Sequence, residues 1–187
     1  SSVRKLNVSY INIENQMAKN ETSTITYSDL LDGDKLYLQR ARLTLPYLVR
    51  QARAGQTIYY SDLAQEIGIP NPRNLNYPLE AIGNGLITLG KNLKLEIPPI
   101  QCLVINKNTN LPGEGIGWFI SETEFKILSK TKKKELVKLQ LTNIYAFPHW
   151  SHVLSALQLE EIDNDIIPII KKAKRIGFGG GESESHK

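Results

Sequence analysis

The chain contains few of the residues that build disulfide frameworks and metal sites. Its 187 residues include one cysteine and three histidines. The single cysteine, Cys102, excludes an internal disulfide framework and a cysteine-rich zinc site. His149 and His152 flank a tryptophan, but no Asp, Glu or Cys lies near them at a ligand spacing. We therefore expect no metal site and no cofactor.

Long apolar runs are also missing. No segment approaches the roughly 20 apolar residues that a membrane helix needs. The first residues, SSVRKLNVSYINIENQ, lack the apolar block of a signal peptide. With 41% hydrophobic and 22% charged residues, the composition is that of an ordinary globular protein. These features predict a cytoplasmic protein with no membrane partner.

The excess of positive charge is small. A formal net charge of +4 permits a polyanionic partner but does not require one. The densest cluster is the KTKKK run at residues 130–134, and Lys171, Lys172 and Lys174 follow later. Such a run can clamp phosphates, or it can be a solvated surface.

The first strong helical pattern extends from Asp34 to about Ala54. Its leucines fall roughly on one face, and Gly55 is well placed to end it. Asp32 or Asp34 can cap its start. Pro46 lies inside the pattern, where it would kink or split a helix.

A helix-turn-helix pattern follows. The short segment 57–60 is β-prone, and Ser61 is a suitable N-cap for a helix over 62–67 that Gly68 would end. The next four residues, IPNP at 69–72, cannot be helical because residues before proline are pushed to extended angles.

A second helix is expected to begin at Asn74 or Asn76 and to run to about Leu89, with a proline tolerated in its first turn. Gly83 and Gly85 each cost this helix roughly 1 kcal/mol relative to alanine. Two explanations remain open, which are close helix packing and close approach to a nucleic-acid backbone.

The remaining pattern completes a winged helix. A strand is expected over 100–105, then a turn over 108–110 and a glycine-rich arm over 111–118 that would form the wing. We predict an α/β, mainly α fold, with a winged helix-turn-helix core and N- and C-terminal helical additions. The expected divisions are a strand and loop extension (1–33), the winged-helix domain (34–120), a helical subdomain (121–176) and a flexible linker (177–187). The N-terminal extension is expected to contain a strand-like segment (3–13). The helical subdomain is expected to contain helices over 124–139, 150–159 and 161–175.

The segment from Tyr60 to Phe119 resembles the DNA-binding domain of O6-alkylguanine-DNA alkyltransferases and alkyltransferase-like proteins. The resemblance is carried by Tyr60-Ser61-Asp62-Leu63-Ala64, by Arg73 ahead of a glycine-containing helix, and by Pro99-Ile100-Gln101-Cys102-Leu103-Val104 before a glycine-rich turn. It implies that the second helix lies in a DNA groove and that Arg73 enters the base stack. The matching tyrosine of that family contacts a phosphate.

One departure removes the chemistry of that family. The position of its nucleophilic cysteine is taken by Ile100, and that of the following histidine by Gln101; Cys102 lies two positions late. Without a thiolate and an activating histidine, alkyl transfer has no mechanism. We find no other nucleophile with a base, no metal cluster and no phosphate-binding glycine loop. We therefore expect no catalytic residues and no enzyme within this chain.

A second, looser resemblance covers more of the chain. The segments PPIQCLVINKNTNLPGEG, FPHWSHVLSALQL and GGGESESHK are similar to the N-terminal part of bacterial restriction-type proteins. In those proteins a GGGESEEHK-like stretch joins this region to a nuclease domain. The resemblance implies a module of a defence system whose nuclease domain lies beyond residue 187.

Each candidate contact has a competing structural role. Arg73 can touch DNA or pair with Glu66 or Glu80; Tyr60 can touch a phosphate or brace the turn. The amides of the second helix suit adenine edges or serve as helix caps. The glycine-rich arm can contact the DNA backbone, or its glycines can serve only to form turns. For Trp118, at the end of the arm, we expect a position in the core. The expected DNA-binding residues are Tyr60, Ser61, Arg73, Asn74, Asn76, Tyr77, Asn84, Lys107, Asn108 and Trp118.

The function favoured by the sequence is recognition of double-stranded DNA by a winged helix-turn-helix, as part of a restriction-type endonuclease. One alternative is a non-catalytic sensor of alkylated DNA that extrudes a base. Another is a winged helix that binds a partner protein. The sequence leaves a homodimer open.

Overall fold

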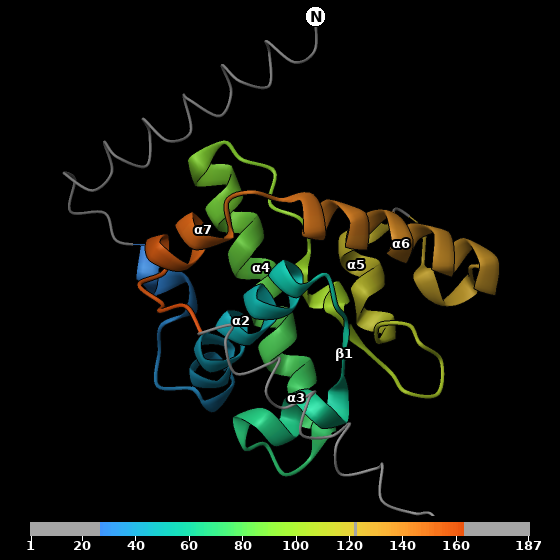
Figure 1. Cartoon of the computed structure of the whole chain (residues 1–187), viewed down its shortest axis with the longest axis horizontal. Helices are drawn as coiled ribbons and strands as arrows, with labels where there is room; N and C mark the ends of the chain where they lie inside the picture. Colours follow the sequence, from blue (N-terminus) through green and yellow to red (C-terminus); the bar gives the residue numbers. More distant parts are fainter. Residues whose placement is uncertain (1–26, 122, 163–187) are drawn as a thin grey trace, which may run out of the picture.

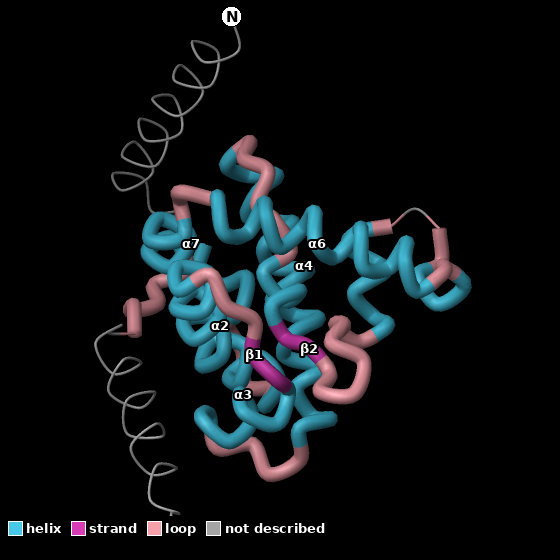
Figure 2. The backbone as a smooth tube through the Cα atoms, turned by 45° about the vertical axis from the view of Figure 1, so that its right-hand side comes forward, coloured by secondary structure: helices cyan, strands magenta, loops and turns pink. Residues whose placement is uncertain are grey.

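The computed structural model describes residues 27–121 and 123–162, and this part of the chain is mainly helical. Two short strands, β1 (Ile58–Tyr59) and β2 (Val104–Ile105), pair in parallel, with Ile58 opposite Val104 (Figure 2). The α-helices are α2 (Leu36–Ala54), α3 (Tyr60–Ile67), α4 (Asn76–Leu93), α5 (Gly117–Ile120), α6 (Lys130–Ala146) and α7 (Trp150–Ala156). The 3-10 turns are η1 (Tyr27–Leu31), η2 (Pro72–Leu75), η3 (Ile100–Leu103), η4 (Glu114–Ile116) and η5 (Phe125–Ile127).

Helix α4 runs through the middle of the molecule, with α2 on one side and α5 and α6 on the other (Figure 1). Helices α2 and α4 pack against each other, and α3 and α7 contact α2. Apolar residues at helical spacing on α2 and α4 form the centre of the core, because burying their side chains is the main stabilising contribution. They include Leu45, Leu48, Val49, Ile82, Leu86 and Leu89.

The ends of α2 and α3 follow local signals. Gly55 and Gly68 both adopt left-handed backbone angles, with φ of 62° and 74°, and end the helices where the sequence predicts. Pro46 is buried inside α2 without splitting the helix. The predicted aspartate cap is wrong: the N-cap residue is Lys35, without a side-chain bond, and the Asp32 carboxylate instead accepts from the Gly33 N–H at 2.9 Å.

The helix-turn-helix segment is formed by α3, η2 and α4. Ser61 is not the N-cap of α3, because the helix already begins at Tyr60. Asn74 and Asn76 are not side-chain caps either. That role belongs to Asn71, whose side chain accepts from the Arg73 N–H at 3.1 Å and stabilises η2. Helix α4 continues four residues beyond the predicted end, to Leu93.

The two glycines of α4 serve packing. A Cβ at Gly83 would lie 2.4 Å from Gln101 Nε2 and 2.5 Å from Phe119 Cε1. A Cβ at Gly85 would lie 3.0 Å from Leu31 Cδ2. Neighbouring side chains therefore occupy the space that a larger residue would need, and the packing explanation is the one that the structure supports.

The strand predicted over 100–105 is mostly wrong. Residues Ile100–Leu103 form η3, and only Val104–Ile105 is a strand. The Cys102 N–H donates to the Pro99 carbonyl at 3.0 Å and closes the turn. All six residues are buried, and an apolar run of this length does not distinguish a buried strand from a buried turn. The arm over 111–118 contains η4 and the start of α5 and no strand.

The C-terminal helices are shifted from their predicted positions. Instead of a helix over 124–139, the chain forms η5 and then α6, which begins at Lys130 and reaches Ala146. Ser129 sets this start, since its side chain accepts from the Lys132 N–H at 3.2 Å. Helix α7 lies within the predicted 150–159. The predictions for 3–13, for 177–187, for the later lysines and for most of 161–175 fall outside the described residues.

An ion pair ties the end of α2 to the segment after α7. Arg53 contacts Glu161 at 2.7 Å and also donates to the Ser151 hydroxyl. The hydrogen bond from Arg53, followed by that from Ser151, lowers the pKa of Glu161 to about 2. Arg42 adds a bond to the Leu157 carbonyl at 3.3 Å. Together these contacts hold the last described residues against the core helix.

Candidate nucleic-acid interface

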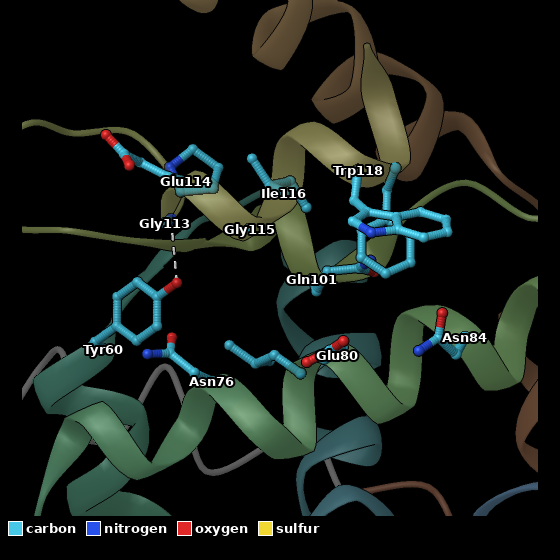
Figure 3. Close-up of a pocket in the computed structure, with 13 residues that line it drawn as sticks. Tyr60, Asn76, Glu80, Asn84, Gln101, Gly113, Glu114, Gly115, Ile116 and Trp118 are labelled. Atoms are coloured by element: carbon cyan, nitrogen blue, oxygen red, sulfur yellow. Dashed lines mark hydrogen bonds between the residues drawn. The ribbon is translucent and has the colours of Figure 1, made fainter. Parts of the chain in front are cut away.

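Helix α4 has one buried and one exposed face. Leu79, Ile82, Leu86 and Leu89 are buried, and the outward face carries polar side chains. Asn76, Glu80 and Asn84 lie along that face, about one helical turn apart (Figure 3). Tyr77 is also outward, with 67% of its surface exposed. As the sequence predicts, Asn76 and Asn84 are exposed on this helix, and Asn74 is exposed just before it in η2.

Arg73 is exposed in η2, immediately before α4. It forms no ion pair with any residue that the structure describes. Glu66, one of its two expected partners, is paired with Arg50 at 2.6 Å, and Glu80 lies on α4 without an ion pair to Arg73. The guanidinium therefore remains available to a ligand, since within residues 27–121 and 123–162 no carboxylate neutralises it.

Tyr60 braces the loop that approaches α4. Its hydroxyl accepts from the Gly113 N–H at 3.1 Å, as the dashed line in Figure 3 shows. Gly113 has no room for a side chain, because a Cβ there would lie 2.8 Å from this hydroxyl. Burial raises the pKa of Tyr60, so the hydroxyl keeps its proton and can still donate it. Tyr60 therefore braces the loop at Gly113, and its contact with a phosphate stays a prediction.

The loop after β2 is held by its own asparagines. The Asn106 side chain accepts from the Asn108 N–H at 2.8 Å, and the Asn106 N–H donates to the Leu111 carbonyl at 2.8 Å. Lys107 and Asn108 are exposed at its tip. The Lys107 ammonium lies 5.5 Å from the centre of the Tyr59 ring. An exposed cation therefore lies beside β1, directly before α3.

Trp118 contradicts its predicted core position, because 80% of its surface is exposed. The core position is taken by Phe125, which packs against Gly117; a Cβ on Gly117 would lie 2.2 Å from Phe125 Cβ. The buried tryptophan of this chain is Trp150, whose indole N–H donates to the Ile144 carbonyl at 3.0 Å. Trp118 is instead at the mouth of a pocket.

This pocket lies between α4 and the segment from η4 to α5 and has a volume of about 410 Å³ (Figure 3). It brings together four of the ten predicted site residues, which are Tyr60, Asn76, Asn84 and Trp118. Ser61, Arg73, Asn74, Tyr77, Lys107 and Asn108 lie outside its walls. Tyr77 lines a separate groove with Asn84 and Tyr37.

Sequence reasoning missed most of the pocket lining, including three residues that shape its chemistry. Glu80 lies between the two predicted asparagines of α4, and Gln101 and Phe119 form part of the wall. Gln101 has a signal in the sequence: it is the only strongly polar side chain in the apolar run IPPIQCLVI. A polar residue in such a run calls for a partner or a ligand.

Cys102 is fully buried, and burial raises its pKa to about 12. It is therefore a protonated thiol inside the core, and not a thiolate that could attack a substrate. Within the described part of the chain, no three His, Cys, Asp or Glu residues gather closely enough to hold a metal ion. No described helix is long and apolar enough to cross a membrane.

Comparisons with protein-family models, with curated proteins and with solved structures find no match for this chain. A functional assignment therefore depends on the residues and geometry given above.

Proposed function

We propose that this chain recognises double-stranded DNA as the DNA-binding module of a restriction-type endonuclease. In this proposal α4 enters a groove, η2 brings Arg73 to the DNA, and the loop over 106–116 acts as the wing of a winged helix. The observation that carries the proposal is an exposed arginine without a partner among the described residues, placed directly before a helix that presents amides outward.

The dimensions of α4 suit this role. Its 18 residues give a rod of roughly 27 Å, and the major groove of B-DNA admits an α-helix. Amides such as Asn76 and Asn84 can pair with an adenine edge, and a carboxylate such as Glu80 can accept from cytosine N4. Arg73 and Lys107 would contact phosphates or a guanine, which positions the helix.

Fluorescence anisotropy with labelled duplexes tests the proposal. We expect binding at low salt that weakens as salt rises, since phosphate contacts release counterions. Arg73→Glu should weaken binding by about 5- to 150-fold, in line with the loss of an arginine contact of roughly 1–3 kcal/mol. Lys138→Glu is the matched control: it makes the same charge change at an exposed site on α6 and should have a much smaller effect. Absence of binding to every duplex, plain or methylated, would end the proposal.

The pocket beside α4 favours a second candidate, a non-catalytic sensor of alkylated DNA. A base turned out of the helix would enter the pocket near Trp118, and Arg73 would fill the vacated stack. The test compares an alkylguanine duplex with its undamaged twin. Equal affinities would exclude the sensor and leave the first proposal standing.

Exposed apolar side chains on α4 support a third candidate, binding of a partner protein. Tyr77 and Ile87 both face solvent. If Arg73→Glu leaves DNA affinity unchanged, this candidate becomes the stronger one. Cytoplasmic location and the absence of catalysis within this chain remain predictions from the sequence.

A further inference from the structure

The wall of the α4 pocket contains a buried carboxamide without a partner. Gln101 is 5% exposed, and neither its Oε1 nor its Nε2 forms a hydrogen bond with any described residue. A buried donor and a buried acceptor that are both unsatisfied destabilise a fold, and most native proteins avoid them. This side chain therefore needs an explanation other than the stability of the fold.

The neighbouring elements are shaped around Gln101. The turn η3 places it opposite α4, and Gly83 leaves open the space that its Nε2 and the Phe119 ring occupy. Glycine inside a helix is itself unfavourable. A carboxamide without hydrogen bonds and a glycine inside a helix, both unfavourable for stability, thus lie together in the pocket wall.

The pocket also selects by charge. Its lining contains no lysine, arginine or histidine, and its charged residues are Glu80 and Glu114. An anion such as a phosphate or carboxylate is disfavoured there. The uncharged lining combines apolar and aromatic side chains with the amides of Asn76 and Asn84. Trp118 is exposed at the mouth, where it can stack on a flat ring. A flat ligand that is neutral or positively charged suits this lining.

We propose that the pocket binds a planar heterocycle with a hydrogen-bond donor and acceptor side by side on one edge, and that Gln101 pairs with that edge. A carboxamide offers the complementary acceptor and donor, as in its pairing with adenine. The ring is supplied either as a free nucleoside or as a base turned out of a duplex; only the second source rests on the proposed function. Both Gln101 atoms are shielded from solvent, so binding requires rotation of this side chain or a shift of Phe119.

Tryptophan fluorescence of the whole chain provides the readout, because Trp118 is exposed and Trp150 is buried. One arm adds free adenosine or guanosine. The other adds a duplex in which one adenine is replaced by 2-aminopurine, whose own emission rises when the base leaves the stack. Trp118→Phe assigns the protein signal, since it should remove the fluorescence change.

The decisive variant is Gln101→Met, which keeps the unbranched shape and removes both hydrogen-bonding atoms. We expect its melting temperature to be unchanged or higher, and binding in at least one arm to fall by at least about tenfold. Gln140→Met, at a half-buried glutamine on α6, is the control and should change neither arm.

Two results would overturn the proposal. The first is the absence of binding that depends on Gln101 in both arms. The second is a lower melting temperature of Gln101→Met with binding unchanged, which would mean that an internal partner such as a water satisfies the carboxamide. Binding of an unmodified duplex that depends on Arg73 tests DNA recognition separately from the pocket proposal. Such binding can persist even if the pocket binds no heterocycle. Nucleoside binding without any duplex binding would support the pocket and refute DNA recognition.

Discussion

Helices α4 and α6 have nearly the same length, 18 and 17 residues, but they meet the rest of the molecule differently. Nine residues of α4 are buried, whereas α6 buries only Val137 and Ile144. Helix α6 carries five lysines and one glutamate, whereas α4 has one of each charge. Of these two helices, the one with more positive charge is therefore not the one whose buried face fixes it beside the pocket.

This difference separates two contributions to binding DNA. Charge on a mobile or solvated surface adds affinity that does not depend on sequence and falls with salt. A helix fixed by its buried face can place amides at defined positions, and this is what base recognition needs. If the proposed function holds, the second role belongs to α4 and, at most, a share of the first to α6.

The largest expected effect is on folding. Ile82→Ala removes a fully buried side chain from α4 and should lower the free energy of unfolding by about 2–5 kcal/mol. Leu139→Ala on α6 removes a side chain that is 56% exposed. This variant should change the free energy of unfolding by less than about 0.5 kcal/mol. Urea denaturation measures both values. Equal losses would mean that α6 is as much a part of the core as α4.

The next effect concerns the packing beneath α4. Gly83→Ala should lower the free energy of unfolding by about 1–3 kcal/mol, because the added methyl overlaps Gln101 and Phe119. Gly115→Ala, where a Cβ would meet no atom within 4 Å, is the control. Thermal melts of the two variants give the comparison. A stabilised Gly83→Ala would show that helix propensity outweighs packing at this site.

The smallest effect is expected from the lysines of α6. Replacing Lys130, Lys132 and Lys134 by glutamine should leave stability within about 0.5 kcal/mol and weaken duplex binding less than Arg73→Glu does. The slope of log affinity against log salt, measured by anisotropy, should change by less than about 1. If the magnitude of this slope fell by about 2.7, all three lysines would contact phosphates, which would contradict the assignment of α6 to a solvated surface.

The sequence predicted well those elements whose limits are set by near neighbours in the chain. Helices α2 and α3 end at Gly55 and Gly68 because a left-handed residue can close a helix without long-range help. The order of helix, turn and helix followed from IPNP at 69–72 in the same way. The outward amides of α4 followed from helical periodicity alone.

The pocket could not be predicted in this way. The two tryptophans have opposite environments, since Trp150 is 3% exposed and Trp118 is 80% exposed. Only the docking of Phe125 against Gly117 decides that Trp118 faces solvent. The predicted strand over 100–105 failed for a related reason, because burial on all sides removes the alternation that marks a half-exposed strand.

By itself, then, the amino-acid sequence determined a mainly helical chain, the positions at which α2 and α3 stop, and an arginine directly ahead of an amphipathic helix. Local backbone preference and periodicity suffice for these features, because they involve residues a few positions apart. Tertiary structure decided that Arg73 keeps no carboxylate partner among the described residues, and that Gln101 lies buried without a hydrogen bond beside Gly83. Both depend on contacts between residues that are distant in the chain, which only the packing of α2, α3, η3 and α4 brings together.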